Sequence, residues 1–538
     1  MSAEASASYQ TTNQVAADRR YWVLAAVLVV QFTAVLTSTI VSTAAPTIVD
    51  ELHGLNLYAW IFTAYLLASS VTVPVVGKLS DLFGRRPFYI GGLLIFLLGS
   101  AISGLAQNMY ELIGARALTG VGGGAMMALA VTTLGDIFSP RERGRWMGLI
   151  MSVFGLGSIV GPTVGGIVTD HFGWRWIFYV NLPLGIFALA MLASTLPRVR
   201  RTGTVNIDWL GIGLLVAAVV PFLIGLTWAG ITYPWSSVQV VTTLGAGLIL
   251  AIFFLVHENR AKEPILSLHL FENRTFTVAV VLSFLVGIAL FGTLTFLPLY
   301  AQGVKGQSAQ DAGLILAPLM IGFVVGSFFG GQMLSRTGRY KVQAIIGMAV
   351  TVIGIFSLSR LGADSSWTFA IAGMVVTGIG VGAVFPILSI AVQSAFPYRL
   401  LGTANSGRQF FNNLGSVIGV PVMTTIVLES FQAELPGHLP AAAARALAGS
   451  GQNLGEGLVS GVGQSALSHV PGLPAAAIPT VVNAIRVSLA VGVQRAFLLS
   501  AVLAAMGFVV TFFLPEIPLR HTVHGDTTAP TAAAAQRG

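Results

Sequence analysis

The most informative stretch of this chain is Gly77-Lys78-Leu79-Ser80-Asp81-Leu82-Phe83-Gly84-Arg85-Arg86, a short polar segment between two long apolar ones. Gly77 allows two helices to approach closely, and Gly84 permits a tight turn. Asp81 can accept hydrogen bonds from the N-terminal amides of a neighbouring helix, or pair with an arginine. The spacing therefore favours a specific contact between helices over an ordinary basic loop.

The composition outside this stretch is that of a membrane protein. Of the 538 residues, 55% are hydrophobic and only 9% are charged, and the mean hydropathy is +0.82. Soluble domains carry roughly 25% charged residues, so the chain is neither a soluble globular protein nor a disordered one. A spanning helix needs about 20 apolar residues, which leaves room for a dozen or more. The absence of cysteine excludes disulfides and thiolate metal sites.

Fourteen apolar segments of spanning length follow one another, and the basic residues fix their orientation. With the N-terminus inside, 21 of the 28 Lys and Arg residues lie on the inner side and five on the outer side. Arg116 and Arg495 lie within spans. The positive-inside rule therefore predicts that both termini are cytoplasmic. The basic excess is a topology signal spread over loops, so nucleic acid is not an expected partner.

The pattern G-x-L-x-D-x-x-G-R-R between the second and third spans resembles the signature of the major facilitator superfamily. The resemblance implies an inner gate made by Gly77, Asp81, Gly84, Arg85 and Arg86, which opens when two halves of the protein rock. A weaker copy, Gly331-Gln332-Met333-Leu334-Ser335-Arg336-Thr337-Gly338-Arg339, begins 254 residues later. Its Gly331, Arg336, Gly338 and Arg339 are expected to form the second-half gate, as an internal repeat requires.

The fifth span carries Gly157, Gly161-Pro162 and Gly165-Gly166. Glycines four apart share one helix face, and proline can bend the helix. The pattern resembles the antiporter motif of drug exporters in this superfamily, whereas bare G-x-x-x-G is ordinary membrane packing.

Further motifs narrow the resemblance to the fourteen-span drug:proton antiporters (QacA/EmrB-like). They include Trp174-Arg175-Trp176-Ile177-Phe178, Glu263-Pro264-Ile265-Leu266 and Phe513-Leu514-Pro515. The resemblance implies an all-α major facilitator fold with fourteen transmembrane helices in a 6+2+6 arrangement.

The expected organisation follows the chain from end to end. It comprises a disordered N-terminal tail (1–18), a six-helix half (19–200), an inserted helix pair (201–260), a second six-helix half (261–518) with a long outer loop (431–492), and a disordered C-terminal tail (519–538). The outer loop lies between spans predicted at 407–430 and 493–515. It is either a spacer or contains short surface helices such as Ala441–Leu447 and Ile478–Leu489.

One departure from the family concerns charge inside the membrane. The family usually has an acid in the first span where this chain has Thr37, while the fourth-span arginine remains as Arg116. No Asp or Glu falls in the middle of a predicted span, so a coupling acid would be peripheral, with Asp136 among the candidates. Arg116 either meets an acidic group of the substrate or is a structural arginine bonded to backbone carbonyls and hydroxyls.

Polar, methionine and aromatic residues on apolar spans are further candidates for a substrate cavity. Each is also compatible with plain interhelical hydrogen bonding or core packing. The candidates are Gln31, Tyr65, Met126, Phe154, Gln393, Arg408 and Asn412.

The sequence contains no nucleotide-binding loop, metal pattern or catalytic constellation, so neither an enzyme nor a cofactor is expected. The prediction is a monomeric multi-pass transporter of the plasma membrane that exports amphipathic drugs by alternating access and proton antiport. Export of anionic or lipid-like metabolites with different coupling is the alternative. A non-transporting membrane sensor is more remote, because such a protein would be expected to lose the gate residues that this chain keeps.

Overall fold

The computed structural model describes residues 19–53, 57–58, 60–196, 206–230, 232–307, 315–397, 400–439 and 478–517. The regular elements in these ranges are all helical. The N-terminal ones are α2 (Arg20–Leu52), α3 (Trp60–Phe83), α4 (Arg85–Leu105), α5 (Met109–Ile137), α6 (Pro140–Phe172), α7 (Trp176–Tyr179) and α8 (Asn181–Thr195). They are followed by α9 (Trp209–Trp228), α10 (Val238–Glu258), the 3₁₀-helix η2 (Leu268–Glu272), α11 (Arg274–Leu299), the π-helical η3 (Tyr300–Val304), α13 (Ala317–Thr337), α14 (Tyr340–Leu358), α15 (Trp367–Ala395), α16 (Leu401–His438) and α20 (Ile478–Thr511).

Fourteen helical segments in the described ranges are long and apolar enough to cross a membrane. In this count α7 and α8 form one span, and α11 continues through η3 as another. The all-α class and the number of spans predicted from the sequence are therefore confirmed.

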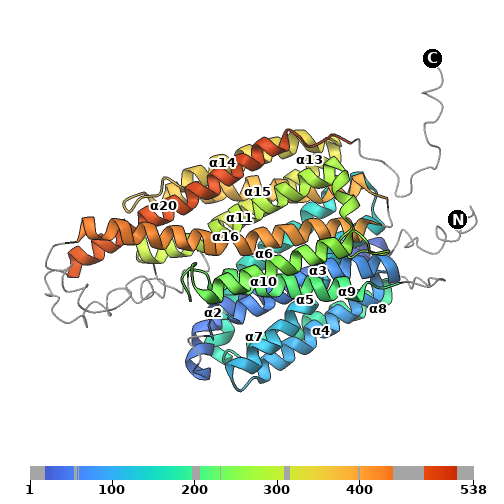
Figure 1. The fold of residues 1–538 in the computed structure, drawn as a ribbon, viewed down its shortest axis with the longest axis horizontal. Helices are drawn as coiled ribbons and strands as arrows, with labels where there is room; N and C mark the ends of the chain where they lie inside the picture. The colour runs from blue at the N-terminus through green and yellow to red at the C-terminus, as the bar shows by residue number, and fades with distance from the viewer. Residues whose placement is uncertain are drawn as a thin grey trace, which may run out of the picture.

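The helices form two halves that lie one above the other in Figure 1. In the N-terminal half, α2 packs on α6 and α8, and α5 packs between α3 and α4. In the C-terminal half, α15 packs on α13 and α14, while α11, α16 and α20 pack on one another. Two seams join the halves, one between α3 and α16 and the other between α6 and α13.

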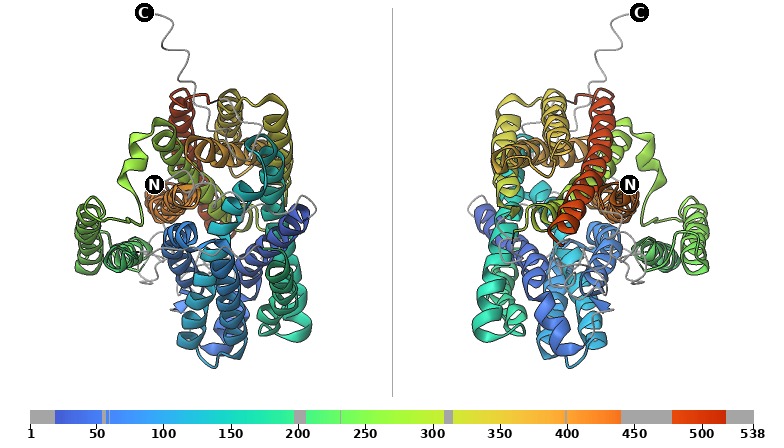
Figure 2. Two further views of the ribbon diagram at one scale, coloured as in Figure 1. Left: turned by 90° about the vertical axis from the view of Figure 1, so that its right-hand side faces the viewer. Right: turned by 90° about the vertical axis from the view of Figure 1, so that its left-hand side faces the viewer.

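The helix pair α9 and α10 stands outside both halves, at the side of the bundle, in the green segment of Figure 2. The two helices pack on each other, and α9 also contacts α3 of the N-terminal half and α16 of the C-terminal half. An apolar cluster joins them, with Leu67 and Val71 from α3, Leu215 and Leu223 from α9, and Phe410 from α16. The pair therefore lies across the α3–α16 seam.

The prediction of an outer loop over the whole of 431–492 is wrong at both ends. Helix α16 continues to His438, and α20 already begins at Ile478. Val481, Ile485 and Leu489 recur at helical spacing and are buried, so this part of α20 is packed rather than a separate surface helix. The predicted helix Ala441–Leu447 and the tails 1–18 and 519–538 lie outside the described residues.

Candidate functional site: the gate between the two halves

The tight turn at Gly84 sets the geometry of the predicted gate. Gly84 has φ 89°, a left-handed conformation that favours glycine, and it separates α3 from α4. Asp81 therefore stands in the last turn of α3, and Arg85 begins α4. We call the end of the bundle that carries these residues the gate end; it is the end predicted to face the cytoplasm.

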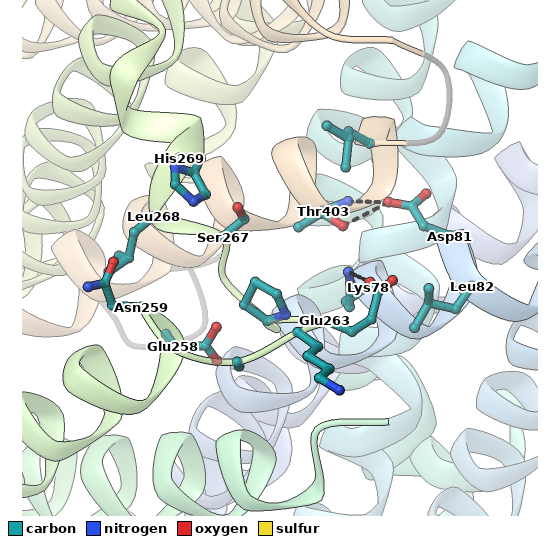
Figure 3. Close-up of a pocket in the computed structure, with 14 residues that line it drawn as sticks. Lys78, Asp81, Leu82, Glu258, Asn259, Glu263, Ser267, Leu268, His269 and Thr403 are labelled. Carbon is teal, nitrogen blue, oxygen red and sulfur yellow. Dashed lines mark hydrogen bonds and ion pairs between the residues drawn. The ribbon is translucent and has the colours of Figure 1, made fainter. Parts of the chain in front are cut away.

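Asp81 binds the N-terminus of α16 across the seam, as Figure 3 shows. Its carboxylate accepts hydrogen bonds from the backbone amides of Gly402, at 3.0 Å, and Thr403, at 2.6 Å. The Thr403 hydroxyl donates a third bond, at 2.9 Å. First-turn amides have no partner within their own helix and carry the positive end of the helix dipole. A negative charge on the N-terminal half is thus matched to a helix end on the C-terminal half.

Arg85 joins two carboxylates at the same place. Its Nη1 lies 2.6 Å from Oδ1 of Asp81, and its Nε lies 3.2 Å from Oδ2 of Asp136 in α5. The side chain of Asp81 is 4% exposed, so this cluster is shielded from water. Asp136, considered above as a coupling acid, is therefore placed in the gate cluster. Arg86 donates to the carbonyl oxygen of Ala193 in α8, at 2.6 Å.

Helices α3 and α16 approach each other closely at Gly77. A Cβ atom at this position would lie 2.0 Å from the Ser406 hydroxyl oxygen. Only glycine fits here without a shift of one helix.

The α6–α13 seam is equally close. A Cβ atom at Gly331 would lie 2.3 Å from the carbonyl oxygen of Gly144 in α6. Arg141 of α6 donates to the carbonyl oxygens of Ser335, at 2.9 Å, and Arg336, at 3.0 Å. The second copy of the motif therefore meets α6 through its backbone.

The remaining residues of the second copy have other surroundings. Gly338 ends α13 in a left-handed conformation with φ 66°. The side chains of Arg336 and Arg339 are exposed. The ion-pair cluster made by Asp81 and Arg85 has no counterpart at these positions, because the second copy has Ser335 where the first has Asp81.

Two predicted cavity residues instead form contacts between the halves. Oε1 of Gln393 lies 3.3 Å from Nη1 of Arg143, which also donates to the Phe138 and Gly135 carbonyls at the gate end. The Phe154 ring in α6 packs on the Phe323 ring in α13, with centroids 5.9 Å apart. Both contacts close the region between the halves.

Arg116 is 1% exposed and lies between α5 and α3. Its Nε donates to the Ile61 carbonyl oxygen at 3.1 Å, and its Cζ lies 4.7 Å from the centroid of the Tyr65 ring. Its Nη1 has no hydrogen-bond partner among the described residues. Thr37 bonds within its own helix, to the Thr33 carbonyl oxygen, so it does not replace the missing acid.

Arg408 is a second buried arginine, on α16 of the other half. It donates to the hydroxyls of Ser283, at 3.1 Å, and Ser389, at 3.0 Å, and its Nε has no partner among the described residues. Asn412, one turn further, donates to the Ser283 carbonyl oxygen at 2.7 Å. In the described part of the chain, neither Arg116 nor Arg408 forms an ion pair with a carboxylate.

Two further candidates lie in the protein core. Met126 is 0% exposed and belongs to the main apolar cluster. Gln31 is buried too, and its Oε1 lacks a hydrogen-bond partner within the described ranges.

The antiporter-motif glycines are used for packing inside the N-terminal half. Cβ atoms at Gly157, Gly161 and Gly165 would each lie within 3 Å of side chains of α2, namely Val35, Thr39 and Thr43 respectively. Pro162 lies inside α6. The motif thus brings α6 against α2 and places no polar group at the gate.

Several residues at the gate end were not predicted from the sequence. They include Thr403 in the first turn of α16, and Arg141 and Arg143 in the first turn of α6. Glu263 belongs to the Glu263-Pro264-Ile265-Leu266 motif of the family resemblance, and its Oε2 lies 2.7 Å from Nζ of Lys78.

Within the described ranges, no group of three His, Cys, Asp or Glu residues could hold a metal ion.

The arrangement defines a two-half membrane carrier, and comparison with known proteins gives its family. The sequence profile of the Major Facilitator Superfamily matches residues 27–420. This chain belongs to the major facilitator superfamily and is a multi-pass transporter of the plasma membrane, not an enzyme.

The chain resembles two transporters of Bacillus subtilis (strain 168). It is 37% identical over 515 residues to the multidrug transporter protein MdtP. This match covers 93% of this chain and 94% of MdtP. It is 36% identical over 449 residues to multidrug resistance protein 3, with 83% and 87% of the two chains covered.

Solved structures share the fold at low sequence identity. The human organic anion transporter MFSD10 (TETRAN) has a TM-score of 0.61 at 14% identity, over 91% of this chain and 99% of that one. The proton:xylose symporter XylE has a TM-score of 0.62 at 12% identity, over 93% and 96% of the two chains.

Proposed function

We propose that this protein exports amphipathic drugs or drug-like compounds by alternating access. Asp81 carries this proposal, because its carboxylate on one half binds the first-turn amides of α16 on the other half. Rocking of the halves would separate these groups and open the gate end. The multidrug relatives support the substrate class.

Exchange with protons is the proposed source of energy. The resemblance to drug:proton antiporters supports it. The chain has no nucleotide-binding loop that would support an ATP-driven pump. The gate cluster supplies two carboxylates that could take up the proton, Asp81 and Asp136, whose side chains are 4% and 15% exposed.

A second candidate is export of anionic or lipid-like compounds. The observation that favours it is the pair of buried guanidinium groups, Arg116 and Arg408, neither of which is paired with a carboxylate in the described structure. A buried cation is stabilised by an opposite charge, and a substrate acid would supply one.

Transport by the purified protein in liposomes tests both candidates. The panel contains cationic dyes and anionic amphiphiles of similar size, each measured with and without a pH gradient. Transport of the dyes that depends on the gradient supports the first candidate. Selective transport of the anions supports the second, and transport of neither class contradicts both.

A further inference from the structure

We infer that the inserted helix pair is part of the gate, and that its linker closes a second bond across the seam through the ion pair of Lys78 and Glu263. This inference rests on the proposed alternating access. It concerns residues 258–272, which join α10 to α11 and which the proposed function does not use.

The linker is fixed to the end of α10 and to α16 of the C-terminal half. The Glu258 carboxylate, at the end of α10, accepts bonds from the backbone amides of Ile265, at 3.2 Å, and Leu266, at 3.3 Å. Leu266 lies against α16, where a Cβ atom at Gly407 would be 3.1 Å from its side chain. These contacts hold the chain on either side of Pro264.

Aromatic packing fixes the other end of the linker. The Phe271 ring of η2 packs edge-on against Phe276 of α11, at 5.1 Å, and Phe411 of α16, at 5.8 Å. At the opposite end of the pair, Trp235 donates to the Thr425 hydroxyl of α16 at 2.7 Å. The linker and the turn between α9 and α10 are thus attached to the C-terminal half, while α9 itself packs on both α3 and α16.

Lys78 reaches this linker from the N-terminal half. It lies one turn before Asp81 on α3, and its side chain is only 8% exposed. Its Nζ lies 2.7 Å from Oε2 of Glu263, whose side chain is 44% exposed. A buried ammonium group left without its partner is strongly disfavoured. Separation of α3 from the linker therefore requires that water reach Lys78.

The two bonds across the seam share one cavity. Lys78, Asp81, Glu263 and Thr403 all line a cavity of about 410 Å³ between the linker and the gate (Figure 3). Because Asp81 binds α16 and Lys78 binds the linker fixed to α16, both bonds favour the same closed gate end. Breaking either one lowers the free-energy difference between the closed and open states.

Thiol labelling tests this inference without any substrate. The chain has no cysteine, so a single Ser152→Cys substitution gives a clean signal. Ser152 of α6 is 4% exposed, and its hydroxyl donates to the Val324 carbonyl oxygen of α13 at 3.3 Å. A maleimide reaches this position only when α6 and α13 separate. The readout is the labelling rate of purified protein in nanodiscs.

Glu263→Gln is expected to raise the labelling rate about threefold or more. Lys78→Met is expected to raise it similarly, and the double variant is expected to match the single ones, because both remove the same bond. Glu434→Gln is the matched control, since its 2.7 Å ion pair with Arg495 joins α16 to α20 within one half. This control is expected to leave the rate unchanged.

An unchanged rate in Glu263→Gln, or additive effects of the two single variants, would overturn the inference. Asp81→Asn separates this result from failure of the proposed function. If Asp81→Asn raises the rate and Glu263→Gln does not, only the linker inference fails. If neither variant changes the rate, the gate itself is not at this seam.

Discussion

The carboxylate of Asp81 in the N-terminal half lies 2.6 Å from the backbone amide of Thr403 in the C-terminal half. Asp81 also pairs with Arg85 at 2.6 Å, and Arg85 pairs with Asp136. One carboxylate thus joins the start of α16 to the turn between α3 and α4. A carrier that opens at this end must break the bonds from Asp81 to α16 in every cycle.

Asp81→Asn is expected to lower the initial rate of efflux about tenfold or more, while the protein still inserts in the membrane at normal yield. The amide keeps the size of the side chain, but it loses the charge that stabilises the N-terminus of α16 and the pair with Arg85. Efflux from cells and the amount of protein in the membrane fraction are the measurements. Asp364→Asn is the control, because that side chain is 98% exposed. Normal efflux by Asp81→Asn would refute the role of Asp81 in the gate.

Gly77→Ala is expected to prevent full closure of the gate end and to slow transport severalfold. The added Cβ would lie 2.0 Å from the Ser406 hydroxyl oxygen. Gly91→Ala, on α4, is the matched control, because a Cβ there meets no atom within 4 Å. Adding Ser406→Gly to Gly77→Ala is expected to restore part of the rate. Equal transport by the two alanine variants would show that this contact does not limit the cycle.

Arg116→Ala is expected to abolish substrate export. The substitution removes the guanidinium group that lies over the Tyr65 ring with its Nη1 unsatisfied in the described structure. Arg116→Lys keeps the charge but not the planar fork, so it is expected to restore export only in part. Arg360→Ala, at an exposed position, is the control. Unchanged efflux by Arg116→Ala would place the substrate site elsewhere.

Glu258→Ala is expected to destabilise the protein by about 1–3 kcal/mol, because it leaves the buried amides of Ile265 and Leu266 without their acceptor. The measurement is the thermal unfolding midpoint of the purified protein. Glu272→Ala, whose side chain is 76% exposed on the neighbouring η2, is the control. A midpoint equal to that of the wild type would show that Glu258 does not hold the linker.

The sequence predicted the fold well because membrane spans depend on local composition. A run of about 20 apolar residues identifies a helix without knowledge of its partners. The continuation of α16 to His438 was not predicted, because residues 431–438 are mixed in polarity. Only Phe431 and Leu435 of this stretch are buried, and their burial depends on packing against other parts of the fold, which composition alone does not report.

The candidate site was predicted in part, for a related reason. Asp81, Gly84 and Arg85 lie within one short motif, so their spacing indicated a shared role. Glu263 lies 185 positions from Lys78 along the chain, and only the fold brings the two side chains together. Gln393 was assigned to a cavity from its polarity, whereas its contact with Arg143 depends on how the halves meet.

The most direct measurement is the initial rate of transport in proteoliposomes that contain either the wild type or Asp81→Asn, over the panel of cationic dyes and anionic amphiphiles and with or without a pH gradient. We predict gradient-dependent transport by the wild type, at least about tenfold faster than by Asp81→Asn. Equal rates for the two proteins, or no transport above protein-free liposomes for any compound of the panel, would contradict it.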